Sequence, residues 1–283
     1  MTVVVTGCRG QLGAALCRLW GQEAAGLDLP EFDLTDRPRV GEILTAIRPR
    51  AVVNTAAYTL VDRAEQEPER CRAVNVDGVT HLVEVCRRLD CTLVQISTDY
   101  VFGKDRGRTT PYRETDVPGP LGVYAQSKLD GELAASQWSK HLIVRTCGLY
   151  GRLAERSAGN FVETMLRLAA AGKPLRVVDD QRCAPSYIPH VARALRFLVD
   201  IDARGVYHVV NAGDATWYEF ACEIFRLSGL NVPVAPITSA EWNAPCPRPS
   251  YSVLDTSKYL ALPNRPDLPR WQAALAEYLR ERG

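Results

Sequence analysis

Two side chains in the stretch VYAQSKLDGE (123–132) have the types and spacing to move a proton, namely Tyr124 and Lys128. This stretch is predicted to be a helix, because Ala125 and Leu129 recur at helical spacing after the loop GPLG. Residues four apart on a helix share a face, so the phenol and the ammonium are neighbours. An ammonium stabilises a phenolate and lowers the phenol pKa from about 10. We therefore predict that Lys128 tunes Tyr124 as a proton donor, although this spacing alone often arises by chance.

A glycine-rich turn near the N-terminus points to a bound dinucleotide. The stretch VVVTGCRGQLGAAL leads from a predicted strand into a predicted helix through Gly7, Gly10 and Gly13. Such a turn lets the backbone approach a pyrophosphate, whose charge then lies at the helix N-terminus. Asp28 ends the second predicted strand and suits a ribose diol, whereas Arg9 would attract a 2′-phosphate, so both NADPH and NADH stay open. A tight strand-to-helix turn without a cofactor is the alternative explanation.

A further polar group ends the predicted strand at 92–97. Ser97, Thr98 and Asp99 lie there, and polar side chains at the carboxyl end of a strand in an open α/β sheet face the ligand crevice. Taken alone, these residues also fit an ordinary strand end with a turn-forming aspartate. Combined with the glycine turn and the tyrosine–lysine helix, they predict a reaction centre.

The elements that must position these groups are predicted from hydrophobic patterns. Uniformly apolar strands alternate with helices in the first half of the chain, which predicts an α/β, Rossmann-like, doubly wound parallel sheet. The predicted strands are 2–6, 24–28, 51–56, 92–97 and 142–147. The predicted helices of this half are 11–21, 36–48, 68–89 and 124–140.

The second half of the chain has a looser pattern. Its predicted helices, joined by proline-rich loops, are 160–172, 187–200, 216–228 and 270–281. We predict a dinucleotide-binding domain over 1–150, to which roughly 175–210 returns. The segments 151–174 and 211–283 are predicted to form a smaller substrate-binding region.

Composition excludes several classes of function. The 283 residues are 46% hydrophobic, which is enough for a core, and 34 basic residues balance 33 acidic ones. We therefore expect neither a nucleic-acid nor a membrane partner, and no signal peptide is recognised. The nine cysteines form no CxxC pair, which favours reduced thiols in the cytoplasm and argues against a metal site.

At this point the chain resembles the extended short-chain dehydrogenases/reductases, and more closely the dTDP-4-dehydrorhamnose reductase family. The similar stretches fall in order over nearly the whole chain and are jointly specific. They are GCRGQLG, NTAAYTLVDRAE, STDYVFG, VYAQSKLDGE, RTCGLYG, GNFVETMLRLA, VVDDQ, GVYHVVNAGDATWYEFA and RPSYSVLD.

The resemblance implies roles for individual residues in the reduction of a dTDP-4-keto-6-deoxy sugar at C4. Tyr124 would be the general acid, Lys128 its partner and a ligand of the nicotinamide ribose, and Thr98 would help to hold the sugar carbonyl. Gln11 and Leu12 would contact the pyrophosphate. The remaining residues implied in the nucleotide cleft are Ala56, Ala57 and Tyr58.

We expect the substrate to contact Thr98, Asp99, Tyr100 and Arg248. Arg248 lies between two prolines in CPRPSYS, and a guanidinium matches the oxygens of a diphosphate. An exposed or salt-bridged arginine is the alternative. A homodimer is the one assembly that we allow for.

The chain departs from the family pattern at two places. Cys147–Gly148 stands where the family commonly has Ser-Trp, and His190 stands at a commonly acidic position. His208, Trp217 and Phe220 are expected to be core residues, because they lie in apolar patterns.

Two other functions compete with sugar reduction. One is a nucleotide-sugar epimerase or 4,6-dehydratase of the same superfamily, but dehydratases typically carry Asp-Glu after the catalytic threonine and here Tyr100 follows Asp99. The other is a non-catalytic dinucleotide-binding regulatory subunit, similar to the methionine adenosyltransferase β subunit. The intact Thr98, Tyr124 and Lys128 weigh against the second alternative.

Overall fold

The computed structural model describes residues 2–156, 159–172 and 174–282. Within these ranges the largest sheet has six parallel strands in the order β10-β5-β4-β3-β1-β2. Their bounds are β1 (Val3–Thr6), β2 (Ala24–Leu27), β3 (Ala51–Asn54), β4 (Thr92–Thr98), β5 (His141–Thr146) and β10 (Gly205–His208). The predicted α/β Rossmann-like fold is confirmed.

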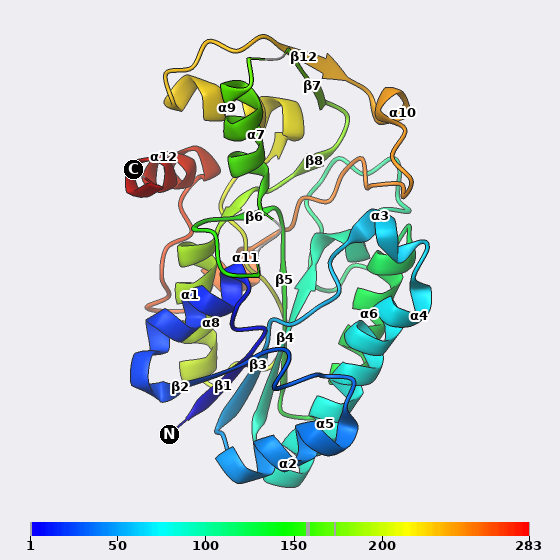
Figure 1. Cartoon of the computed structure of the whole chain (residues 1–283), viewed down its shortest axis with the longest axis vertical. Helices are drawn as coiled ribbons and strands as arrows, with labels where there is room; N and C mark the ends of the chain where they lie inside the picture. The colour runs from blue at the N-terminus through cyan, green and yellow to red at the C-terminus, as the bar shows by residue number, and fades with distance from the viewer. Residues whose placement is uncertain (1, 157–158, 173, 283) are drawn as a thin grey trace.

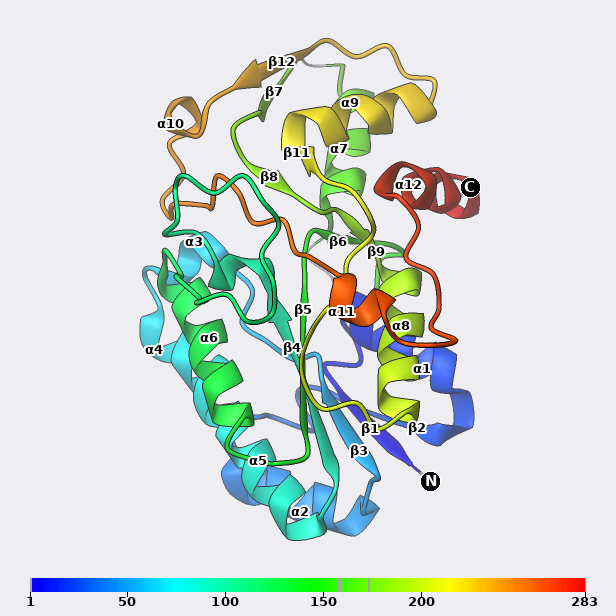
Figure 2. The same cartoon turned by 180° about the vertical axis from the view of Figure 1, so that it is seen from behind.

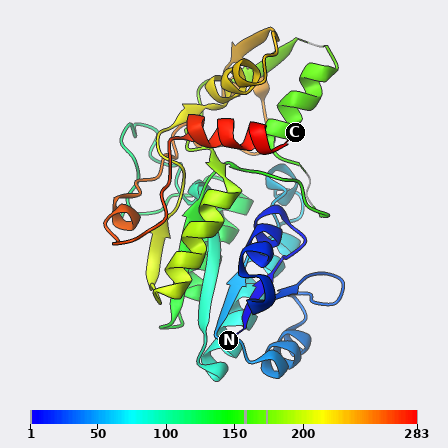
Figure 3. The same cartoon turned by 90° about the vertical axis from the view of Figure 1, so that its left-hand side faces the viewer.

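Helices cover both faces of this sheet (Figure 1). Alternate strand residues point to opposite faces, so Val3 and Val5 pack in one core and Val4 in the other. The first core is closed by α1 (Gln11–Trp20) and α8 (Ile188–Asp200), which pack side by side (Figure 3). The second core is closed by α2 (Arg37–Ile47), α5 (Gly78–Leu89) and the end of α6 (Val123–Ala135).

The strand order reverses direction at β1, because β2 lies on one side of it and β3 on the other. In an open α/β sheet the ligand crevice lies outside the carboxyl ends of the strands at such a switch point. The residues that follow β1, β3 and β4 therefore meet at one edge of the sheet.

The C-terminal elements gather beyond this edge (Figures 1 and 2). Their core contains Tyr150, Phe220 and Trp271. The helices are α7 (Phe161–Ala170), α9 (Trp217–Leu227), α10 (Ser239–Trp242) and α12 (Trp271–Arg282), while α11 (Ser257–Leu260) contacts β10. The paired strands are β7 (Leu175–Val178) with β12 (Val234–Ile237), β8 (Arg182–Cys183) with β11 (Ala215–Thr216), and β6 (Leu149–Tyr150) with β9 (Ser186–Tyr187).

The segment 175–210 divides between the two parts. Helix α8 and strand β10 join the large sheet, whereas β7 pairs with β12 away from it. The reason is that β7 finds its partner 59 residues later in the chain, at Val234 opposite Leu175, which no local pattern encodes. The exact division into two domains stays a prediction.

The predicted helix 68–89 consists of three pieces in the structure. It contains α4 (Pro68–Arg72), a π-helical turn (Ala73–Asp77) and α5, and the short helix α3 (Val61–Ala64) precedes it. Among the described residues, no helix is both long and apolar enough to cross a membrane. All nine cysteines lie in the described ranges, and each is free.

Candidate active site

The glycine turn links β1 to α1 at the switch point. Gly7 has a φ of +70°, a conformation that favours glycine, and its carbonyl accepts from the Gly10 amide at 3.0 Å. A Cβ at Gly13 would lie only 2.2 Å from the Gly7 carbonyl oxygen. The turn is therefore as tight as the sequence predicts, and it leads directly into the N-terminus of α1.

A cavity of about 460 Å³ opens over this turn. Every predicted cofactor residue apart from the tyrosine–lysine pair lines this cavity. These residues are Gly7, Gly10, Gln11, Leu12, Gly13, Asp28, Ala56, Ala57 and Tyr58. Sequence reasoning missed Arg70 and Arg156, which add positive charge to the same lining. Arg70 lies in the short helix α4 and Arg156 in a turn far along the chain, so no local motif marks them.

Asp28 lies half-buried at the end of β2. Its two carboxylate oxygens accept from the backbone amides of Arg9 and Leu29, both at 2.8 Å. The Arg9 guanidinium turns to the Leu29 carbonyl at 2.6 Å and pairs with Glu31 at 3.5 Å. Asp28 is thus held in a fixed position at the cavity wall, where a ribose diol would be within its reach.

We predict that Asp28→Ala weakens NADH binding more than NADPH binding. The carboxylate accepts hydrogen bonds from a ribose diol but repels a 2′-phosphate, so its loss harms only the first cofactor. Fluorescence titration with both cofactors measures the effect. An unchanged affinity for NADH would show that Asp28 does not contact the cofactor.

Asn75, in the π-helical turn, is a supporting residue that sequence reasoning missed. Its side chain accepts from the Tyr58 amide at 2.9 Å and donates to the Tyr58 carbonyl at 3.1 Å and to Ser127 Oγ at 2.9 Å. It therefore ties the loop after β3 to α6. A buried asparagine inside a predicted helix is the one signal that could have marked it.

A second cavity, of about 240 Å³, contains Tyr124, Lys128 and Thr98. It shares lining residues with the cofactor cavity, so the two form one continuous cleft. The shared residues are Leu12, Thr55, Ala57, Thr59 and Leu149. The structure thus brings the three predicted catalytic residues together at the inner end of the cofactor cleft.

Lys128 reaches from α6 under the end of β4. Its Nζ donates to the Ile96 carbonyl at 2.7 Å, and the side chain is buried. Burial lowers the pKa of Lys128 to about 8, while the negative charge of Glu132, one turn further along α6, acts in the opposite direction. The lysine therefore titrates near the neutral range.

Tyr124 does not have the lowered pKa that its spacing from Lys128 predicts. Burial raises the pKa of Tyr124, and the nearby Asp99 adds to the rise, although hydrogen bonding with Thr98 opposes it. The prediction from spacing was wrong because removal of the phenol from water dominates its pKa, and the group that opposes the rise is Thr98, not Lys128. Tyr124 is instead a phenol that stays protonated.

We predict that kcat/KM falls as the pH rises through about 8, because Lys128 loses its charge there. Below its pKa the lysine is an ammonium and can support the phenol and bind a ribose; above it, the amine does neither. A kcat/KM profile across this range tests the prediction, with Lys128→Met as the control. The variant should have a lower kcat and weaker cofactor binding, and its kcat/KM should no longer fall at alkaline pH. A wild-type kcat/KM that stays constant well above pH 8 would show that Lys128 is not the titrating group.

Of the predicted substrate residues, Thr98 and Asp99 line the catalytic cavity and the other two do not. Asp99 is 2% exposed and lines that cavity, while Tyr100 and Arg248 line a third cavity of about 440 Å³. Aromatic and apolar side chains form most of the third lining, among them Phe161, Trp217, Trp242, Met165 and Leu168. All of its lining residues except Tyr100 come from the C-terminal elements.

Arg248 is paired with a carboxylate. Its two terminal nitrogens lie 2.5 and 2.8 Å from the oxygens of Asp62, and its side chain is 9% exposed. The guanidinium also lies over the Trp242 ring, 5.5 Å from the centroid, and lowers the Asp62 pKa. Arg248 is therefore salt-bridged, as the alternative explanation expected, and its contact with a diphosphate stays a prediction.

Two expected core residues are fully buried, and the third, Trp217, packs against the core but is only partly buried. His208 is fully buried and bonded to the Asp255 carbonyl, and Phe220 is fully buried. Trp217 is only half-buried and lines the third cavity, with its ring 3.5 Å from where a Cβ of Gly148 would lie. Gly148 carries no ring, but Trp217 supplies one at the same end of the site.

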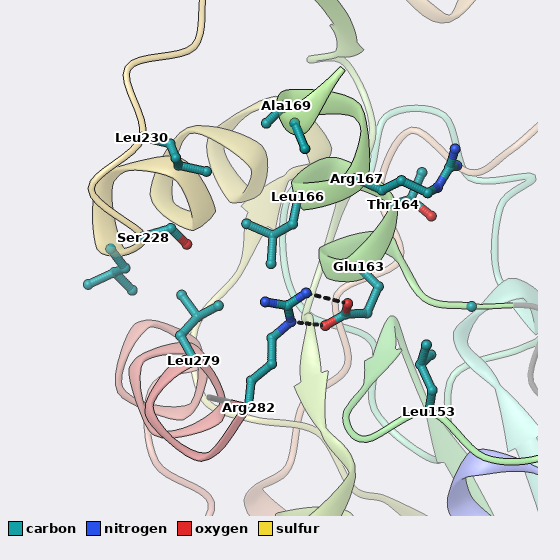
Figure 4. A pocket seen from close by; sticks show the side chains of 13 residues that line it. Leu153, Glu163, Thr164, Leu166, Arg167, Ala169, Ser228, Leu230, Leu279 and Arg282 are labelled. Carbon is teal, nitrogen blue, oxygen red and sulfur yellow. Dashed lines mark hydrogen bonds and ion pairs between the residues drawn. The ribbon is translucent and has the colours of Figure 1, made fainter. Parts of the chain in front are cut away.

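A separate hollow of about 730 Å³ lies between α7, α9 and α12 (Figure 4). Arg282 pairs with Glu163 across it, with Nε 2.5 Å from Oε1. None of the catalytic residues lines this hollow, so we place no chemistry there.

Comparison with known proteins decides the family. The chain matches the family model described as RmlD substrate binding domain over residues 1–283. It belongs to this family. It is 40% identical to the spore coat polysaccharide biosynthesis protein SpsK of Bacillus subtilis, covering 99% of this chain and 97% of that one. It is also 40% identical to a Streptomyces griseus dTDP-4-dehydrorhamnose reductase, covering 97% and 91% respectively.

Solved structures agree with the assignment to the RmlD family. A dTDP-4-dehydrorhamnose reductase from Bacillus anthracis, in complex with NADP, superposes with a TM-score of 0.93 at 33% identity, covering 99% of this chain and 100% of that chain. A Thermus thermophilus UDP-glucose 4-epimerase, 24% identical with a TM-score of 0.85 and covering 100% and 99% of the chains, shares the fold.

Proposed function

We propose that the protein reduces the C4 ketone of dTDP-4-dehydrorhamnose to dTDP-rhamnose with NADPH or NADH. The observation that carries this proposal is the meeting of Tyr124, Lys128 and Thr98 at the inner end of the cofactor cleft. Family membership supports it, because several relatives at 36–40% identity are named dTDP-4-dehydrorhamnose reductases.

The residues supply what ketone reduction needs. The nicotinamide cofactor provides the hydride when it is bound. Tyr124 stays protonated because burial raises its pKa, so it can give its proton to the alkoxide that develops on the substrate oxygen. Lys128 would hold the nicotinamide ribose and, as an ammonium, stabilise the phenolate left behind.

The aromatic third cavity suits the nucleotide part of the substrate. A base can stack on rings such as Trp217 and Phe161. The Arg248 guanidinium bonds to Asp62 through two of its nitrogens, and its other N–H groups can still donate to a ligand. We propose that Arg248 binds the diphosphate there and that Tyr100 lines the passage to the catalytic cavity.

We predict that Arg248→Ala raises the KM for the nucleotide sugar about tenfold to a hundredfold and leaves cofactor affinity unchanged, because a charge-assisted hydrogen bond is worth about 1.5–3 kcal/mol. Steady-state kinetics with a separate cofactor titration measures both quantities. Asp62→Asn is the matched control, since it removes the pairing charge but keeps the arginine. If Arg248 only anchors its loop, one of two results is expected. Either Arg248→Ala leaves the KM unchanged, or Asp62→Asn raises the KM as much as Arg248→Ala does.

The experiment that tests the function is NADPH oxidation by the purified protein with dTDP-4-dehydrorhamnose. We expect turnover with this ketone and none with dTDP-glucose, which a 4,6-dehydratase would consume. A non-catalytic dinucleotide-binding subunit would bind NADPH and turn over neither sugar. Tyr100 favours reduction over dehydration, because it occupies the place where dehydratases typically carry a second acid.

The nine free thiols fit a reducing compartment, and on that basis we propose that the protein works in the cytoplasm. A homodimer stays a prediction.

A further inference from the structure

The helix that carries Tyr124 begins without a cap of its own. Its N-cap residue is Gly122, which has no side chain to accept from the first amides of α6. The amide of Val123 donates instead to Glu65 Oε1 at 2.8 Å, and Glu65 ends α3, 58 residues earlier in the chain. A carboxylate from another segment thus caps α6 directly before the catalytic tyrosine.

The same short helix holds the loop that contains Arg248. Asp62, three residues before Glu65, accepts from the Cys246 amide at 3.2 Å and from two nitrogens of Arg248. Residues three apart are neighbours on a helix surface, and Glu65 keeps helical backbone angles. One face of α3 therefore bonds to the start of α6 and to the substrate-binding region.

Cys246 brings these two segments into contact with each other. A Cβ at Gly122 would lie 2.4 Å from Cys246 Sγ and 2.7 Å from Glu65 Oε1, so the thiol and the carboxylate both lie against this glycine. Burial raises the pKa of the Cys246 thiol to about 12, and hydrogen bonding with Glu65 adds to the rise. The thiol stays protonated and can donate to the carboxylate. The lack of a side chain at Gly122 leaves room for this contact.

The apolar side of α3 packs beside the catalytic tyrosine. Ala64 is fully buried in one cluster with Tyr58 and Tyr124, and Val61 and Val123 pack against this cluster. Interiors are closely packed, so a shift of α3 would displace the residues around the Tyr124 ring. Helix α3 thus contacts the proton donor through packing and through the cap that Glu65 supplies.

We infer that Glu65 is a positioning residue for Tyr124, which fixes the start of the catalytic helix against the loop that carries Arg248. It lines neither the cofactor cavity nor the catalytic cavity, so it acts through the Val123 amide. A nucleotide sugar that reaches from Arg248 to Tyr124 then meets both groups at a fixed separation. The inference rests on the proposed reductase function and deepens it.

A double-mutant cycle tests the inference. Glu65→Ala removes the cap, so we expect kcat to fall about tenfold, comparable to the loss of a helix N-cap. The KM and the NADPH affinity should stay unchanged, because Arg248 keeps its bonds to Asp62. Glu65→Gln should retain most of the kcat, since its amide oxygen can still accept from Val123. In a Tyr124→Phe background, Glu65→Ala should lower kcat no further, because its effect passes through the phenol.

The matched control is Asp36→Ala, which removes the carboxylate cap of α2, a bond to the Arg39 amide at 3.0 Å. It should lower the unfolding temperature and leave kcat unchanged. If Glu65→Ala does not fold, Gly122→Ala decides, because its Cβ would push Glu65 and Cys246 from their places and should lower kcat in the same way.

Two results overturn this inference alone, in an enzyme that still reduces the ketone. One is a wild-type kcat in Glu65→Ala, or in Gly122→Ala where that variant decides. The other is a loss of kcat that persists in full beside Tyr124→Phe. A wild-type protein without turnover of dTDP-4-dehydrorhamnose overturns the proposed function and this inference with it.

Discussion

Replacing Tyr124 by phenylalanine should lower kcat by about 10²–10⁴, the usual contribution of a positioned general acid. The variant loses only the phenolic oxygen and its proton. Tyr124 is 9% exposed and its ring meets Tyr100 edge-on, contacts that a phenylalanine ring keeps. Folding and cofactor affinity should therefore stay close to those of the wild type.

Steady-state kinetics on dTDP-4-dehydrorhamnose, with thermal unfolding and NADPH titration as controls, measures this effect. Thr98→Val should be milder, since it removes one hydrogen bond and leaves the proton donor in place. Wild-type turnover by Tyr124→Phe would mean that the tyrosine–lysine pair is only a helix surface.

Replacing Gly10 by valine should abolish dinucleotide binding. Gly10 precedes α1 with φ −81° and ψ 167°, a conformation open to any residue, and an added Cβ would meet only the Gly7 carbonyl oxygen, at 3.3 Å. The dihedral angles therefore allow a side chain once the Gly7 carbonyl shifts by a few tenths of an ångström, but the branched valine would occupy the space of a pyrophosphate at the helix N-terminus.

Gly13→Ala is the contrasting variant, because its Cβ would collide with the backbone of the turn. We expect Gly10→Val to unfold at the wild-type temperature without binding NADPH, and Gly13→Ala to unfold at a lower temperature. If Gly10→Val binds NADPH as tightly as the wild type does, the cofactor does not bind at this turn.

The strands and helices of the sheet were predictable because each carries its pattern locally. Val3, Val4 and Val5 are apolar on both faces, as a strand between two helical layers must be, and the predicted strand agrees with β1 within one residue. The β7–β12 pair was not predictable, because β7 alone fits several partners and its position depends on a strand far along the chain.

In the candidate site, too, features within one element were predictable and contacts between distant segments were not. The glycine turn and the Tyr124–Lys128 pair are spaced within single elements, so the sequence reveals them. The bonds of Asp99 to Ser252 and of Arg248 to Asp62 span 153 and 186 residues, and only the folded chain brings them together. The pKa of Tyr124 also depends on burial by several elements, which spacing cannot show.

The central claim is that Tyr124 and its neighbours reduce the C4 ketone of a dTDP-sugar with hydride from a nicotinamide. The most direct measurement supplies NADPH deuterated at the transferable position of nicotinamide C4 together with dTDP-4-dehydrorhamnose, and locates the deuterium in the product by nuclear magnetic resonance. The account predicts dTDP-rhamnose that carries one deuterium at C4, formed by the wild type and lost with Tyr124→Phe. Oxidation without deuterium at C4, or no oxidation at all, would contradict it.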